Sequence, residues 1–238
     1  ELLGLIGIVA FFWRAPLRVA LGQHRRGVAA HAAVGALVVA ALTGWLATRE
    51  RPLPGDPTVF PAAALRTAAP APDFTLVDQD GATVSRAGLK GRVVMLTGVY
   101  ASCGLACPRI LSQARRAVAA LTESEREEVV VLGITLDPER DDTARLAELA
   151  KAQQVTAPRF RLLSGASDDV NRALDRYEIG RKRDPTTGVI EHTNVFVLID
   201  RRGRVAYRLG LGELQEKWLA DGMRSLLGEP RDRTAMQE

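Results

Sequence analysis

The stretch that decides the fold is Val93–Ile110, with the sequence VVMLTGVYASCGLACPRI. It begins with Val93–Val99, an apolar run rich in β-branched residues, which is typical of a buried strand. A short turn follows, and then a pattern that predicts an amphipathic helix. The two cysteines of the chain, Cys103 and Cys107, lie where the strand gives way to the helix. Pro108 directly after them is well suited to a first helical turn.

A strand-to-helix junction favours thiol chemistry. The unpaired N–H groups and the partial positive charge of a helix N-terminus stabilise a thiolate, which is both a nucleophile and a metal ligand. A spacing of four places the sulfurs of Cys103 and Cys107 on one side of the turn. The pair could therefore close a disulfide or hold one soft metal ion. The alternative is a pair of small buried apolar residues, because free cysteine often packs as a hydrophobe.

Composition places the chain among ordinary folded proteins. It has 238 residues, of which 47% are hydrophobic and 25% charged, enough for one domain with additional elements. The pI of about 9.4 reflects a modest surplus of Arg and Lys. We expect no nucleic-acid partner, because the sequence shows no basic stripe interleaved with aromatic residues.

The amino-terminal segment, residues 1–48, is predicted to lie in a membrane. Gly27–Thr48 contains no Asp, Glu, Lys or Arg and is long enough to cross a hydrocarbon core of about 30 Å. Trp45 suits the membrane interface. Leu2–Trp13 is also apolar and could be the remaining half of an earlier span. Four arginines lie between the two runs, at Arg14, Arg18, Arg25 and Arg26.

The positive-inside rule places that arginine-containing loop in the cytoplasm. Residues after Thr48 are then expected on the extracytoplasmic, periplasmic side of the cytoplasmic (inner) membrane. A signal sequence and a buried soluble helix are the alternatives for Gly27–Thr48. His24 and His31 are seven residues apart and could share a helix face, so a haem or metal role is conceivable beside an interfacial or packing role.

Three further segments are predicted after the membrane segment. Arg49–Pro72 contains six prolines among many alanines, a composition that sustains neither helix nor sheet and predicts an extended linker. Residues 73–228 are predicted to form one domain, and the charged tail 229–238 is expected to be loose. Strands are expected at Asp73–Val77, Thr83–Ser85, Arg92–Val99, Glu128–Leu136, Phe160–Leu163, Asn194–Asp200 and Val205–Leu209. Helices are expected at Pro108–Leu121, Asp142–Gln153, Ser167–Tyr177 with Ser167 as its cap, and Glu213–Leu227.

This order of elements predicts an α/β domain with a mixed sheet flanked by helices. The cysteine turn would lie at the carboxyl end of the first long strand, where such sheets usually carry their sites. His192 is the only histidine after the linker and directly precedes the strand Asn194–Asp200. If the fold is thioredoxin-like, the loop with His192 faces the cysteine turn. Two thiolates and one imidazole suit copper, since thiolates favour Cu(I) and an imidazole makes Cu(II) tolerable. A solvent-exposed histidine without a role is the alternative.

These residues together resemble the SCO/SenC family of membrane-anchored, thioredoxin-like copper-binding proteins. The resemblance lies in the C-x-x-x-C-P motif Cys103–Pro108 after an apolar strand, and in His192 before a strand that ends at Asp200. It extends to Ile134–Ala150 (ITLDPERDDTARLAELA), to APDFTLVDQDG near the start and to FRLLSG at Phe160–Gly165, and covers about Pro70 to Leu227. Between the cysteines this sequence lacks the acidic residue often found in the family.

The resemblance implies that Cys103, Cys107 and His192 are copper ligands. It implies a metallochaperone that assists assembly of the copper A site of cytochrome c oxidase, by copper transfer or by thiol reduction. The partners would be the oxidase subunit with that site, other copper chaperones or thiol reductants. The alternative is an extracytoplasmic thiol–disulfide oxidoreductase that cycles Cys103 and Cys107 without a metal. Peroxide reduction would need Thr or Ser where Tyr100 stands, and a disulfide that only staples the turn is a further alternative.

Overall fold

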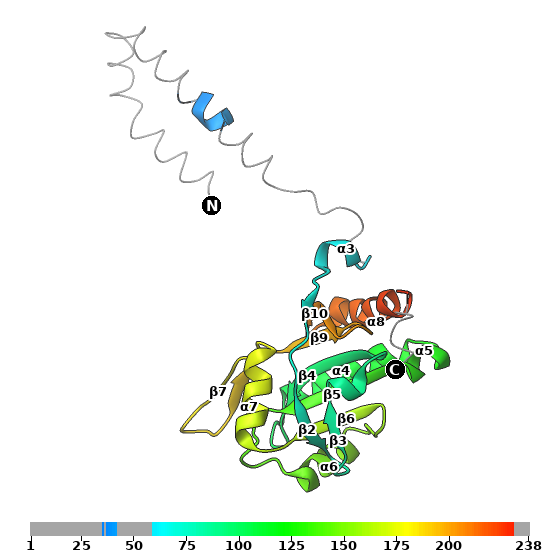
Figure 1. The fold of residues 1–238 in the computed structure, drawn as a ribbon. Coiled ribbons are helices and arrows are strands. Elements are labelled where there is room, and N and C mark those ends of the chain that lie inside the picture. The colour runs from blue at the N-terminus through cyan, green and yellow to red at the C-terminus, as the bar shows by residue number, and fades with distance from the viewer. Residues whose placement is uncertain (1–34, 36, 42–58, 231–238) are drawn as a thin grey trace, which may run out of the picture. The chain divides into compact units, whose positions relative to one another are not determined.

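The structure is a computed structural model that describes residues 35, 37–41 and 59–230. The chain divides into two units, 1–56 and 57–238, and the second contains a mixed β-sheet flanked by helices (Figure 1). In the first unit, the helical residues 37–41 include the exposed, apolar Leu37 and Val38. None of the helices within the described ranges has the length and hydropathy needed to cross a membrane. The predicted spans 2–13 and 27–48, apart from those few helical residues, lie outside the described residues, as does most of the predicted tail.

The second unit is built on an eight-stranded sheet with the order β1-β10-β9-β4-β5-β6-β2-β3. At its centre, β4 (Val93–Val99) pairs in parallel with β5 (Val129–Thr135), and every residue of both strands is buried. Continuous apolar strands are expected where helices cover both faces of a parallel sheet. The other strands are β1 Ala69–Pro70, β2 Thr75–Asp78, β3 Thr83–Ser85, β6 Phe160–Ser164, β9 Val195–Ile199 and β10 Arg204–Gly210.

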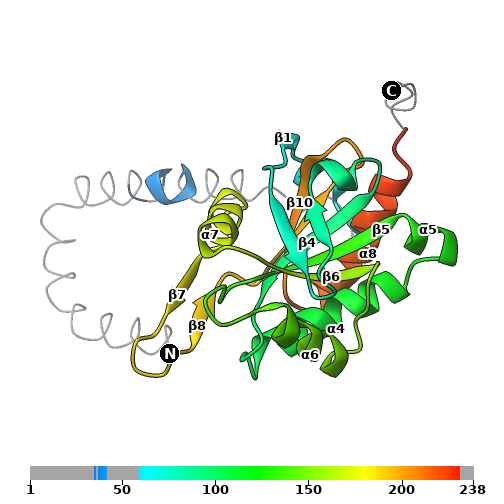
Figure 2. The same ribbon diagram turned by 60° about the horizontal axis from the view of Figure 1, so that its bottom comes forward.

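The helices lie on both faces of this sheet. The crossovers from β4 to β5 and from β5 to β6 contain α4 (Ala106–Ala119) and α6 (Thr143–Ala152), and both step across the sheet in the same direction. Because such crossovers are right-handed, the two helices share one face. The last helix, α8 (Glu213–Leu227), packs against α4, whereas α7 (Ser167–Arg176) lies on the opposite face (Figure 2).

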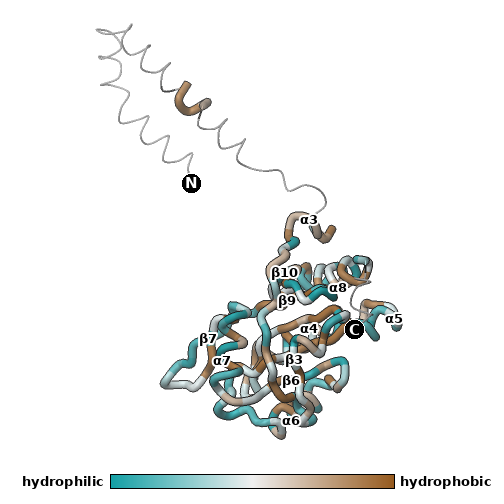
Figure 3. The backbone as a smooth tube through the Cα atoms, in the orientation of Figure 1, coloured by the Kyte–Doolittle hydropathy of each residue, from teal (hydrophilic) through white to brown (hydrophobic). Residues whose placement is uncertain are grey.

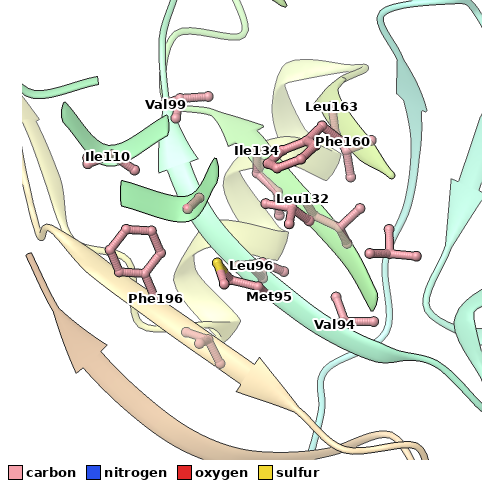
Figure 4. Close-up of a cluster of buried hydrophobic side chains, with 14 of the residues drawn as sticks. Val94, Met95, Leu96, Val99, Ile110, Leu132, Ile134, Phe160, Leu163 and Phe196 are labelled. Carbon is pink, nitrogen blue, oxygen red and sulfur yellow. The ribbon is translucent and has the colours of Figure 1, made fainter. Parts of the chain in front are cut away.

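The core lies between the sheet and these helices (Figure 4). Met95 and Leu96 of β4 and Leu132 of β5 are completely buried. Phe196 of β9 lies on the other side of β4, so the central strand is packed against side chains from both of its neighbours. The hydropathy colouring shows hydrophobic residues along the central strands and a mixture of hydrophilic and hydrophobic residues along the helices (Figure 3). The predicted strands and helices of this core are confirmed within a few residues of their expected ends.

The prediction that Arg49–Pro72 forms neither helix nor sheet is wrong for its described second half. Ala62–Leu65 forms the short helix α3, and Ala69–Pro70 forms β1, which pairs antiparallel with β10. The amide N–H groups of Thr67 and Ala71 also donate to carbonyls of the β10 region, at 2.8 and 2.9 Å. The prolines therefore do not prevent pairing, because at a sheet edge only one side of the strand needs its N–H donors. The domain limits themselves stay a prediction.

Two local predictions after β6 are also wrong. Ala166, whose side chain makes no capping hydrogen bond, takes the cap position of α7, and Ser167 is the first helical residue. The segment predicted as turn-rich, 181–188, begins with β7 (Arg181–Arg183), which pairs with β8 (Ile190–His192) in a separate two-stranded sheet. This β7–β8 hairpin extends from the body of the domain (Figure 2). One helix, α5 (Glu123–Glu127), was not predicted from the sequence. It begins with a capping box between Thr122 and Glu125.

Candidate metal centre

The two cysteines occupy the turn that joins β4 to α4, and both are free thiols. Cys103 lies in the turn, and Cys107 lies in the first turn of α4, which begins at Ala106. The N-cap residue, Leu105, makes no side-chain capping bond. Instead, the Cys107 N–H donates to the Cys103 Sγ at 3.2 Å. The sulfur thus satisfies one of the helix's orphan donors, as a capping oxygen usually does.

His192 reaches the cysteines because of the direction of β9. This strand is antiparallel to β4, with Leu96 opposite Val197, so the residues before β9 lie near the carboxyl end of β4. His192 ends β8 and is separated from β9 by only two residues. The ligand atoms of Cys103, Cys107 and His192 all lie within 4.8 Å of one another. No other group of three such side chains is found in the described part of the chain.

The spacing of these atoms fits a single metal ion. Two ligands bound to one ion at a typical metal–sulfur length of about 2.3 Å stand at most about 4.6 Å apart. The ligand atoms lie within 4.8 Å of one another, which is slightly more than this limit. A small rotation of the side chains would bring them to bonding distance of one ion. The His192 Nδ1 lies 3.5 Å from the Thr193 carbonyl oxygen. When Nδ1 donates there, Nε2 keeps its lone pair for a metal.

The two thiols differ in burial and in pKa. Burial alone would raise the pKa of the Cys103 thiol, but hydrogen bonds from the Cys107 thiol and from the Cys107 and Leu105 N–H groups outweigh it, so this pKa is lowered. For Cys107, burial raises the pKa far above its usual value, and the hydrogen bond with the Cys103 thiol adds to this effect. Cys103 is therefore the first of the two to ionise and is the outer, reactive sulfur.

A cleft of about 500 Å³ opens onto Cys103 and His192. The burial of the His192 ring lowers its pKa, which keeps the imidazole neutral and able to bind a metal at neutral pH. Two large apolar side chains stand at the edge of the cleft, Leu105 with 78% and Val189 with 52% of its surface exposed. Cys107 is completely buried. The cleft is thus lined by Cys103 and His192 but not by Cys107, and it has an apolar rim.

Two residues near the site escaped the sequence analysis. Tyr100, noted there only as a departure from a peroxidase pattern, is buried and lines the cleft. Asp141 is buried behind the turn, and its Oδ2 accepts hydrogen bonds from the Ala101 N–H at 3.0 Å and the Thr135 hydroxyl at 2.6 Å. Burial raises the pKa of Asp141, with these two hydrogen bonds acting in the opposite direction. The other two histidines, His24 and His31, lie outside the described residues.

Comparison with known proteins gives consistent matches. The SCO1/SenC family model matches residues 62–227. A SCO2-like protein of Rickettsia conorii is 26% identical over 164 residues, which cover 67% of this chain and 76% of that protein. The copper-bound structure of Bradyrhizobium japonicum ScoI matches with a TM-score of 0.59 and 26% identity, over 66% of this chain and 99% of that one.

The structure of BsSco, described as having a disulfide switch and as a member of the Sco family of cytochrome c oxidase assembly proteins, shares the fold. It matches with a TM-score of 0.60 and 21% identity, over 68% of this chain and 96% of that one. The predicted α/β, thioredoxin-like fold with its mixed sheet is confirmed by these structures.

Proposed function

The chain belongs to the SCO1/SenC family, and on that premise we propose that it binds one copper ion through Cys103, Cys107 and His192. The convergence of these three ligand atoms within 4.8 Å carries the proposal. The copper bound in the ScoI structure of Bradyrhizobium japonicum supports the choice of metal. Two thiolates suit Cu(I), and the imidazole adds the harder ligand that Cu(II) accepts.

We further propose that the copper is cargo, delivered to the copper A site of a cytochrome c oxidase subunit. Delivery requires acceptor thiolates to replace the ligands one at a time, so the site must be open on one side. Cys103 faces the cleft, whereas Cys107 is completely buried. An acceptor thiolate would replace Cys103 first, and Cys107 would hold the ion until the second acceptor ligand is in place. Leu105 and Val189 supply apolar surface for contact with the acceptor.

Membrane attachment belongs to the same proposal. The apolar segment 27–48 would anchor the chain in the cytoplasmic membrane, and the α/β domain would lie on the extracytoplasmic side. This position would place the site on the side of the membrane where a periplasmic acceptor is available. Protease protection of the domain in intact cells, and its loss after the outer barrier is opened, would test this arrangement.

Copper titration of the full chain in detergent, with the thiols reduced, tests the metal site. We expect one copper per chain and a thiolate-to-Cu(II) absorption band. Cys103→Ser combined with Cys107→Ser should abolish tight binding, and His192→Ala should change the band. His31→Ala is the matched histidine control and should change neither. Unchanged copper binding in the double cysteine variant would refute the site.

Thiol–disulfide exchange is the second candidate, favoured by the lowered pKa of the Cys103 thiol, which lines the cleft. In this reaction the Cys103 thiolate attacks an acceptor disulfide and releases one acceptor thiol. Cys107 then attacks the Cys103 sulfur and releases the second, so that the acceptor is reduced and a Cys103–Cys107 disulfide forms. A separate thiol reductant must restore the pair. The raised pKa of Cys107 slows the second step, because only its thiolate attacks.

The two candidates differ in what the acceptor gains. Incubation of the copper-loaded chain with a reduced copper A domain should produce the visible band of that centre if copper is delivered. Incubation of the copper-free, reduced chain with the oxidised domain should produce free acceptor thiols if the chain is a reductase. A chain that produces thiols but no copper centre would support the second candidate.

A further inference from the structure

Tyr100 contacts every part of the chain that holds a ligand of the candidate metal centre. It follows β4 directly and is 4% exposed. Its own N–H donates to the Cys107 Sγ at 3.4 Å, and its carbonyl accepts from the Cys103 N–H at 3.2 Å. The main chain of this one residue therefore fixes the turn that holds both sulfurs.

The side chain of Tyr100 extends from the cysteine turn to the strand that contains His192. The hydroxyl accepts a hydrogen bond from the Ile190 N–H at 3.3 Å. The tyrosine ring meets the His192 ring edge-on, with the ring centres 6.0 Å apart and an angle of 86° between the planes.

These contacts matter because β8 is not part of the main sheet. It pairs only with β7, in a separate two-stranded sheet. The backbone ladder that fixes β4 and β9 therefore does not fix His192. Among the contacts that hold the end of β8 near the domain are the Tyr100–Ile190 bond and the bond from the Thr193 N–H to the Gly180 carbonyl, at 2.9 Å. Ile190 precedes His192 by two residues, so a bond at Ile190 sets how closely the imidazole approaches the sulfurs.

We propose that Tyr100 is a positioning residue of the copper site, whose hydroxyl sets the distance between the imidazole and the cysteine pair. This inference rests on the proposed function, since it concerns the same copper site. It predicts an effect that depends on the oxidation state of the ion. Cu(I) can be held by two thiolates alone, whereas Cu(II) needs the imidazole. Loss of the hydroxyl should weaken the binding of Cu(II) and leave the binding of Cu(I) largely unchanged.

The test is Tyr100→Phe, which keeps the ring and its contact with His192 and removes only the hydroxyl. We expect the Cu(II) dissociation constant to rise about five- to tenfold, the effect of one hydrogen bond. The thiolate-to-Cu(II) band should shift, and the Cu(I) dissociation constant should stay within about twofold. Tyr177→Phe is the matched control, because Tyr177 is also buried and its hydroxyl donates to the Pro72 carbonyl at 2.8 Å. This control should leave both constants and the band unchanged.

A double-mutant cycle with His192→Ala shows whether Tyr100 acts through the imidazole. Tyr100→Phe should have no further effect on Cu(II) binding when His192 is already alanine. A full effect in that background would overturn the proposal, as would equal losses for Cu(I) and Cu(II) or an unchanged Cu(II) site in the single variant. Should the unmodified chain bind no copper, the proposed function itself fails. Copper binding that is normal in the unmodified chain and insensitive to Tyr100→Phe refutes the inference alone.

A measurement on the unmodified chain decides the question if Tyr100→Phe does not fold. The Ile190 amide bonds to the tyrosine hydroxyl, so its hydrogen exchange reports that contact. We expect protection similar to that of the amides in β9. Exchange at the rate of a free amide would overturn the proposal.

Discussion

Replacement of Arg183 by methionine should loosen the β7–β8 hairpin. An Arg183 nitrogen lies 2.5 Å from the Asp137 Oδ1, and Asp137 is 2% exposed, whereas Arg183 is 31% exposed. In Arg183→Met, the cation that remains near this carboxylate is Arg140, at 3.4 Å. The other oxygen, Oδ2, has no hydrogen-bond partner among the residues described. The substitution would therefore leave a buried carboxylate poorly compensated.

The magnitude follows from the burial of the two partners. Breaking a fully buried ion pair costs about 3–5 kcal/mol, because the remaining charge is uncompensated. Arg183 is partly exposed, so water partly screens this pair, and we expect a loss of about 2 kcal/mol in the free energy of unfolding. Methionine keeps the apolar length of the side chain, so the loss reports the ion pair together with the hydrogen bond from Arg183 to the Gly188 carbonyl, at 2.7 Å. Denaturation by urea, followed by circular dichroism, measures it.

The control is Arg172→Met on α7. Arg172 pairs with Asp169 at 2.7 Å, but both side chains are more than half exposed. Such a surface pair contributes about 0–1 kcal/mol. The Arg183 substitution should also speed hydrogen exchange at the amides of β8, because Arg183 lies opposite Ile190 in the hairpin. Equal losses for the two arginine variants, with unchanged exchange in β8, would refute the reasoning.

Three further predictions concern the site and its surroundings. Iodoacetamide should modify Cys103 much faster than Cys107, because Cys103 lines the cleft and has the lower pKa, whereas Cys107 is completely buried. Mass spectrometry of short reactions measures both rates, and faster modification of Cys107 would contradict the assignment. The pKa of Asp141 is raised, so the folded state binds the proton of this carboxyl group more tightly than the unfolded state does. The protonated group therefore contributes stability. This contribution is complete below the unfolded pKa of about 3.9 and is lost as pH rises through the folded pKa. Relative to Asp141→Asn, the unmodified chain should therefore gain stability as pH falls from about 7 to 4, and a difference independent of pH would disprove the shift. Leu105→Glu should slow copper transfer to an acceptor severalfold while its copper affinity stays within about twofold, as transfer assays and titrations can show; unchanged transfer would exclude the apolar rim from docking.

Long elements of the fold could be predicted because their patterns are strong on their own. The runs that became β4, β5 and β9 are apolar except for one threonine in each of β4 and β5, and α4 and α8 have clear helical periodicity. Short elements depend on what they pack against. Ala69–Pro70 has little strand propensity and is a strand only because β10 offers a free edge. The β7–β8 hairpin had a usable signal in Asp184–Gly188 (DPTTG), whose glycine has a φ of +73°.

The candidate site was predictable to a different degree for each ligand. The adjacency of Cys103 and Cys107 follows from their spacing at a strand–helix junction. His192 lies near the cysteines because β9 runs antiparallel beside β4. That pairing can be predicted from the sequence only after a fold has been assumed. The unequal burial of Cys103 and Cys107 could not be predicted, because it depends on the exact residue at which α4 begins. The helix begins at Ala106, so Cys107 is a helical residue that packs in the core, whereas Cys103 lies in the turn before it.

The candidate site combines a fixed pair of proposed ligands with a third on a separately held element. The sulfurs are fixed by the end of β4 and the first turn of α4, both part of the core. His192 depends on a hairpin held by a few identifiable contacts, among them Arg183 with Asp137 and Tyr100 with Ile190. The affinity for Cu(I) should therefore follow the stability of the core, and the affinity for Cu(II) the position of the hairpin. A partner that displaces the hairpin would lower the affinity for Cu(II) without disturbing the cysteine pair, so the same site would then favour Cu(I) over Cu(II).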